Sequence, residues 1–130
     1  MDTQLMNNSE LHLENVEWNK MLKMWRQEII SLQDKLSEVV NTRTEKEFLI
    51  ELAELENNCI IHKEKINKLQ DRIKTEDLGY LRNIKEHNEI ASETDIELHN
   101  QIKERFDTEF DMFAELKKDF DTFFAKYNIN

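Results

Sequence analysis

Residues 44–73 read TEKEFLIELAELENNCIIHKEKINKLQDRI, and this stretch decides the fold. Its first four residues, Thr44-Glu45-Lys46-Glu47, have the spacing of a capping box, which predicts a helix start. From there the chain carries a seam in alternating steps of four and three: Phe48, Leu52, Leu55, Cys59, His62, Ile66, Leu69 and Ile73. Such 3.5-residue spacing is typical of a helix that packs along one face against neighbouring helices. We therefore expect a long helix over residues 45–87.

Gly79 is the single glycine of the chain, and it leaves two interpretations of where this helix ends. A glycine often terminates a helix. However, Tyr80, Leu81 and Ile84 keep helical spacing beyond it, and a glycine inside a helix costs only about 1 kcal/mol. The pattern favours a helix that continues through Gly79 to residue 87.

The same spacing recurs on both sides of this central helix. The preceding seam, within residues 9–41, consists of Leu11, Trp18, Leu22, Trp25, Ile29, Leu32, Leu36 and Val39. The following seam, within residues 95–127, consists of His99, Ile102, Phe106, Glu109, Phe113, Leu116, Phe120, Phe123 and Tyr127, after a second capping box at residues 94–97. Short connections make neighbouring helices antiparallel. The expected fold class is all-α: an up-down-up three-helix antiparallel bundle, or coiled coil, with long helices in one domain of 130 residues.

Composition and charge narrow the range of functions. The chain has no proline, and its formal net charge of −10 repels nucleic acid and anionic membrane surfaces. Cys59 is the only cysteine, so an intrachain disulfide is impossible and a reducing compartment is the simpler assumption. No stretch approaches the roughly 20 apolar residues of a membrane span. We expect a cytoplasmic protein with neither nucleic acid nor membrane as partner.

The sequence contains no recognisable catalytic motif. Paired Glu-x-x-His elements of di-iron bundles, His-Glu-x-x-His, glycine-rich phosphate loops and nucleophile elbows are all absent. We therefore expect neither enzymatic activity nor a cofactor.

Polar residues at seam positions leave two interpretations open. These positions are Asn15, His62, Glu76, His99 and Glu109. Buried polar groups can specify helix register, or they can belong to a ligand site. Cys59 and His62 lie three residues apart on one helical face, with Glu28 expected about one turn away, and a thiolate with an imidazole can bind zinc. A second cluster of His12, Glu76 and His99 would meet only if the central helix ended near Leu78.

Apolar residues outside a closed core offer docking surfaces. The candidates for a protein interface are Trp18, Trp25, Tyr80, Leu81, Ile84, Phe110 and Phe124. For the two tryptophans core packing is the favoured role, and a helix-docking surface is the alternative. If the central helix outruns its neighbours, its ends expose apolar seam, which favours self-association. The leading hypothesis is a non-enzymatic helical interaction protein that forms a homo-oligomer or docks on a protein partner. The alternative is a small metal- or ligand-binding bundle using Cys59, His62 and Glu28.

Residues 17–18, 25–29, Leu36 and the ending from Phe120 to Tyr127 resemble a family of small uncharacterised bacterial all-helical proteins. The resemblance spans most of the chain and rests on residues common in helices. Members of that family carry more histidines, where this chain has Asn57, Asp71 and Asp95. The resemblance implies an all-helical fold and supplies no activity.

Overall fold

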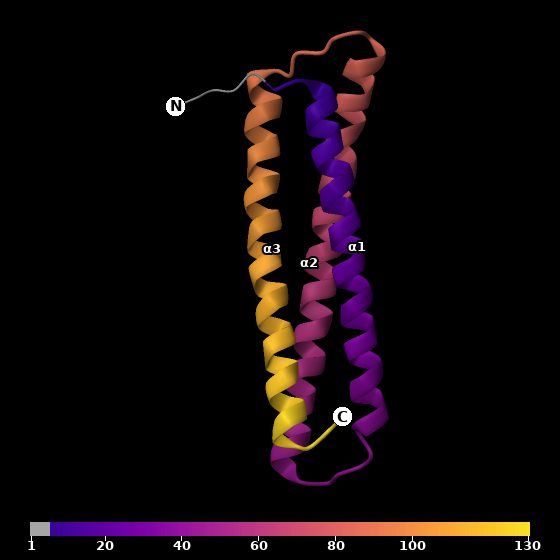
Figure 1. The fold of residues 1–130 in the computed structure, drawn as a ribbon, viewed down its shortest axis with the longest axis vertical. Helices are drawn as coiled ribbons and strands as arrows, with labels where there is room; N and C mark the ends of the chain where they lie inside the picture. The colour runs from indigo at the N-terminus through magenta and orange to yellow at the C-terminus, as the bar shows by residue number, and fades with distance from the viewer. Residues whose placement is uncertain (1–5) are drawn as a thin grey trace. The chain divides into compact units, whose positions relative to one another are not determined.

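The computed structural model of the protein describes residues 6–130, which form three α-helices (Figure 1). α1 spans Asn8–Val39, α2 spans Lys46–Lys85 and α3 spans Glu93–Lys126. Side-chain contacts join α1 to α2 in antiparallel order, and α2 to α3 likewise. The predicted all-α three-helix bundle is confirmed. None of the described helices combines the length and the apolar character that crossing a membrane requires.

The contacts between residues group into two compact units. The first unit combines the chain up to Lys23 with residues 67–108, and the second combines residues 24–66 with residues 109–130. Each unit takes one segment from each of the three helices. Every site described below lies within one unit.

The ends of the helices follow from local hydrogen bonds. The Glu45 carbonyl accepts the first bond of α2 from the Leu49 N–H at 3.1 Å, so α2 begins at Lys46. At the start of α3, the Ser92 hydroxyl accepts a bond from the Asp95 N–H at 3.0 Å. The capping residue is therefore Ser92, and the expected box at residues 94–97 was wrong by two residues. α3 therefore begins at Glu93, two residues before the start that the sequence pattern indicated.

α2 continues through Gly79, as the apolar spacing predicted, and ends at a left-handed residue. His87 has a φ of 61°, and the Asn88 N–H donates to the Asn83 carbonyl at 2.8 Å. The end of α3 repeats this arrangement at Asn128, which has a φ of 55°. In both places this turn satisfies carbonyls that the last helical turn leaves without partners.

The buried residues are largely those of the three predicted seams. In the first unit they include Leu11, Trp18, Leu22, Leu69, Ile73, Tyr80, Ile102 and Phe106. In the second unit they include Trp25, Ile29, Leu36, Phe48, Leu55, Ile66, Phe113, Leu116, Phe120 and Phe123. The aromatic rings stack across helices: Trp18 lies 5.7 Å from Phe106 between ring centroids, and Phe48 lies 5.4 Å from Phe123. Each unit thus has its own aromatic core.

The connection between α2 and α3 is tied to the start of α1. The Asn8 N–H donates to the Glu89 carbonyl at 2.8 Å, and the Asn8 side-chain amide donates to the Asn88 carbonyl at 2.8 Å. The Ala91 N–H donates to the Met6 carbonyl at 3.1 Å. Asn8 is fully buried, so these bonds satisfy polar groups that would otherwise be costly. This tie fixes where α3 begins in the first unit.

Gly79→Ala should stabilise the protein. The residue sits inside α2, its φ is not positive, and a Cβ added there would meet no atom within 4 Å. Alanine is preferred to glycine in a helix interior by about 1 kcal/mol. We expect a rise of roughly 3–5 °C in the midpoint of thermal unfolding, measured by circular dichroism. An unchanged or lower midpoint would contradict an unstrained helix at this position.

Candidate functional site

Of the three residues of the predicted metal site, Glu28 and His62 line different grooves of the second unit, and Cys59 lies in its core. Glu28 on α1 forms an ion pair with Lys117 of α3, with 3.4 Å between Oε1 and Nζ. His62 on α2 lines another hollow with residues of α3, among them Asp111 and Met112. Cys59 is fully buried. Among residues 6–130, no three His, Cys, Asp or Glu side chains come close enough to hold a metal ion. The structure therefore does not bring these residues together.

Burial also makes Cys59 a poor metal ligand, because it disfavours the thiolate that binds a metal ion, whereas it favours the neutral imidazole of His62. Desolvation raises the pKa of the Cys59 thiol to about 12, and the nearby Glu56 carboxylate adds to this. The pKa of His62 is lowered, first by desolvation and then by Lys65. Cys59 thus acts as a small core residue.

The Cys59 thiol should be inert in the folded protein. With a pKa of about 12, only about one thiol in ten thousand is ionised at pH 8, and alkylation requires the thiolate. We expect iodoacetamide to modify native protein at least a hundredfold more slowly than protein unfolded in guanidinium, as followed by intact mass. Equal rates in the two states would show that Cys59 is accessible.

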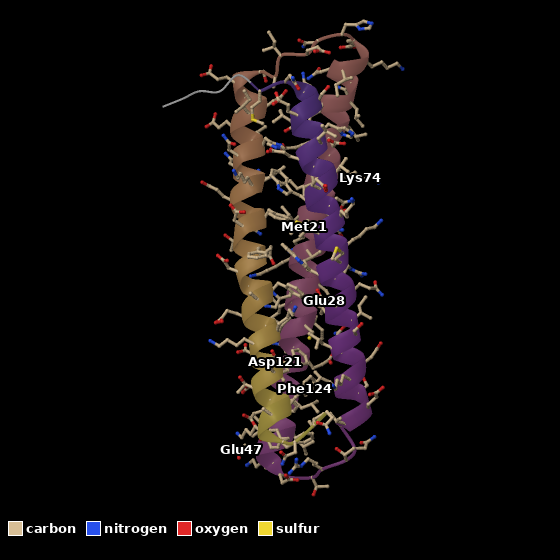
Figure 2. All side chains as sticks on the ribbon, viewed as in Figure 1. Met21, Glu28, Glu47, Lys74, Asp121 and Phe124 are labelled. Carbon is tan, nitrogen blue, oxygen red and sulfur yellow. The ribbon has the colours of Figure 1, made fainter. Side chains whose placement is uncertain are left out.

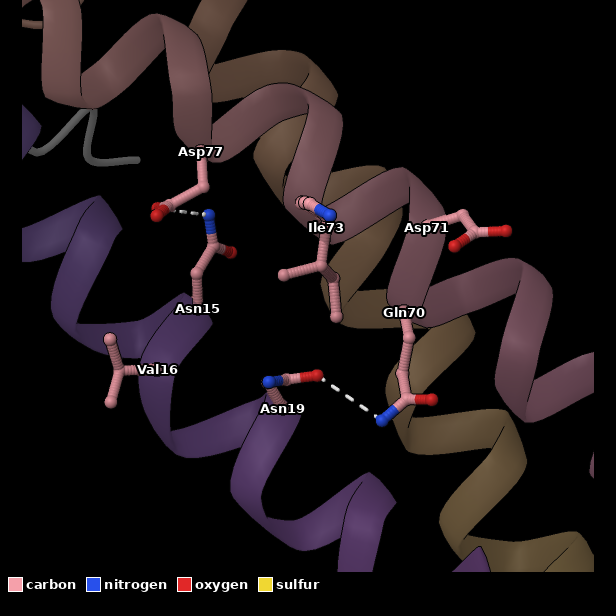
Figure 3. Close-up of a pocket in the computed structure, with 8 residues that line it drawn as sticks. Asn15, Val16, Asn19, Gln70, Asp71, Ile73 and Asp77 are labelled. Carbon is pink, nitrogen blue, oxygen red and sulfur yellow. Dashed lines mark hydrogen bonds between the residues drawn. The ribbon is translucent and has the colours of Figure 1, made fainter.

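A polar groove of about 250 Å³ lies between α1 and α2 in the first unit (Figure 3). At one end of the groove, the Asp77 carboxylate accepts bonds from His12 Nδ1 at 2.9 Å and from Asn15 Nδ2 at 2.9 Å. Two turns away along α2, Gln70 donates to Asn19 Oδ1 at 3.2 Å. Asn15 is only 2% exposed, and its Oδ1 has no hydrogen-bond partner within the described chain. These bonds pair α1 with α2 at a defined register.

A second polar network crosses the interior of the same unit. His99 is buried and its Nε2 donates to the Glu14 carboxylate at 2.6 Å. Its Nδ1 lies 3.3 Å from the oxygen of the Tyr80 hydroxyl, and this hydroxyl donates its proton to Glu76 at 3.2 Å. Trp18 stacks on the His99 ring at 4.7 Å. Each of these polar groups has at least one hydrogen-bond partner within the network.

This network corrects two expectations about the histidines. We expected Glu76 and His99 to meet only if α2 ended near Leu78, and His99 to lie closer to Ile84 otherwise. α2 is long, yet Tyr80 joins Glu76 to His99, because α3 begins two residues earlier than predicted. His12 does not join this network and bonds to Asp77 instead.

Asp77→Ala should destabilise the protein by about 1–3 kcal/mol, because it removes the shared acceptor of His12 and of the buried Asn15 amide. The free energy of unfolding in urea measures the loss. Asp71→Ala is the matched control, since Asp71 lines the same groove but is exposed. A loss no larger than that of the control would mean that the Asp77 bonds contribute little.

The residues predicted for protein interaction divide by burial. Trp18, Trp25 and Tyr80 are 9%, 5% and 2% exposed, so they belong to the core, which was the favoured interpretation for the two tryptophans. These side chains are buried because the apolar seams of the three helices pack against one another. Tyr80 in particular packs against His99 and Leu11. Leu81 and Phe110 are exposed, whereas Ile84 and Phe124 are partly buried. Figure 2 shows Phe124 on α3, where the Lys35 ammonium lies 4.6 Å from the ring centroid.

A second apolar line runs along the outer face of α2 in the second unit, and we name it the outer stripe. It consists of Leu49, Ile50, Ala53, Asn57, Ile60 and Ile61. The four large side chains are 40%, 48%, 44% and 39% exposed, in the order Leu49, Ile50, Ile60 and Ile61. We did not predict this stripe. The sequence does contain a signal for it, because Ile50, Ala53, Asn57 and Ile60 repeat the four-and-three spacing of the core seam on a neighbouring face of the helix.

Comparison of the chain with protein-family models, curated proteins and solved structures finds no match. Any account of function therefore depends on the site geometry.

Proposed function

We propose that this protein is a non-enzymatic helical interaction protein that acts by self-association through the outer stripe. The observation that carries the proposal is a row of four exposed large aliphatic side chains on one helical face. An uncovered apolar row of this kind is typical of a surface that binds another protein.

The stripe is bounded within the second unit, where the other exposed large apolar side chains are Met24 on α1 and Phe110 on α3, at 60% and 50%. On the outer face of α3 in this unit, the exposed residues include Asp111, Lys118 and Thr122. On the outer face of α1 they include Gln27 and Asp34. Further along α2, the positions that continue the stripe are Glu64, Asn67, Asp71 and Thr75. The stripe is therefore a bounded patch rather than general surface apolarity.

Its spacing favours another helix as the binding element. Ile50, Ala53, Asn57 and Ile60 follow steps of three, four and three, which is the spacing of a coiled-coil seam. Full burial of each half-exposed Ile or Leu would stabilise the complex by about 1 kcal/mol. The loss of translational and rotational freedom on association offsets part of this gain. We expect a weak, reversible association.

Sedimentation equilibrium over a wide concentration range tests the proposal. The wild-type protein should shift from monomer towards dimer as its concentration rises to about 1 mM. Ile60→Asp should raise the dissociation constant at least about tenfold, because it places a carboxylate in a contact that excludes water. Its unfolding free energy should change little, since Ile60 is 44% exposed.

Leu13→Asp is the matched control, because Leu13 is 61% exposed but lies on α1 outside the stripe. It should associate like the wild type. A monomer at every concentration, or an equal effect of the two substitutions, would overturn self-association through this face.

A further inference from the structure

Resting on the proposed self-association, we propose the orientation and the register in which two copies of this chain meet at the outer stripe. The α2 helices of the two copies lie antiparallel, and a two-fold axis passes level with Leu55. Residue i of one copy then faces residue 110 − i of the other. Each step below concerns residues of the second unit.

The apolar residues match themselves in this register. Ile50 of each copy faces Ile60 of the other, and Leu49 and Ile61 flank this pair on the two edges of the stripe. Near the axis, Asn57 faces the small Ala53, which leaves room for the amide to turn towards water at the edge. A two-fold contact requires a surface that is complementary to itself, and the stripe has this symmetry about Leu55.

Charges select the antiparallel order. Lys46 and Glu64 flank the stripe on the same helix face, both are exposed, and within the described chain neither makes an ion pair. In the proposed register Lys46 of each copy faces Glu64 of the other. Opposite charges across an interface fix register as well as partner.

A parallel pair of the same helices would meet like with like. Lys46 would face Lys46 and Glu64 would face Glu64, which is unfavourable. Asn57 would face Asn57, an arrangement that parallel coiled coils tolerate. The charged flanks therefore distinguish the two orders. The contact from Lys46 to Glu64 extends over about 27 Å of helix at about 1.5 Å per residue.

Charge exchange in the full-length protein tests the register. Lys46→Glu and Glu64→Lys should each raise the dimer dissociation constant about tenfold at low salt, because each turns two attractive pairs into repulsive ones. The double variant K46E/E64K should return to within about threefold of the wild type. In a parallel dimer each position would face the same position of the other copy, so like charges would stay opposite each other in the single and the double variants alike. Combining the two substitutions would then restore no affinity. Absence of rescue overturns the antiparallel register.

Disulfide trapping gives a second, independent readout. In a Cys59→Ala background, equal amounts of Ile50→Cys and Ile60→Cys protein are mixed, one of them labelled with ¹⁵N, and oxidised. The antiparallel register predicts mainly mixed dimers by mass, because positions 50 and 60 face each other. The two copies of position 50 would lie about 15 Å apart along the axis, too far for a disulfide.

The outcomes separate the two proposals. Dimers of like chains in excess of mixed dimers, in a protein that sedimentation shows to associate, would overturn the register and leave self-association intact. A wild-type protein that stays monomeric would overturn both. Trapped mixed dimers together with charge rescue support both.

Discussion

The bundle depends on burying one apolar seam from each of three helices at the same time. A single helix with such a seam is not stable in water, because most helical stability in proteins comes from packing of the apolar face. Here the seams close with aromatic stacks, such as Trp18 on Phe106 and Trp25 on Phe113. The same closure removes both tryptophans from the surface and desolvates Cys59. Residues that could have served docking or metal binding are used to form the core.

Polar groups within that core set the relative register of the helices. Asp77 accepts bonds from His12 and Asn15, and His99 bonds to Glu14 on one side and Tyr80 on the other. A shift of one helix by a turn would leave these buried groups without partners, at a cost of about 1–3 kcal/mol each. The networks resemble a catalytic cluster in composition. Their groups are committed to one another, however, and this favours a structural role.

With the core seams of the three helices packed together, the outer face of α2 in the second unit still carries a row of exposed aliphatic side chains. α2 carries two parallel rows at coiled-coil spacing, of which the core uses one. Ile50 and Ile60 belong to the second row and remain about half exposed. With Lys46 and Glu64 at its ends, this row has apolar and charged parts that complement a reversed copy of itself.

The sequence by itself determined the three helices, the continuity of α2 through Gly79 and most of the buried positions, because heptad spacing is a local property of the chain. Even so, its pattern placed the start of α3 two residues late, since Ser92 could be identified as the cap only where the connection packs on Asn8 and Met6. Only the tertiary structure decided that Glu28 and His62 line different grooves, that Tyr80 joins Glu76 to His99, and that Trp18 and Trp25 are covered. These outcomes depend on which side of each helix faces which neighbour, and a single-helix pattern does not contain that information. For the same reason, the row at Ile50, Ala53 and Ile60 could be identified as exposed only once the structure showed that the other seam of α2 faces the core.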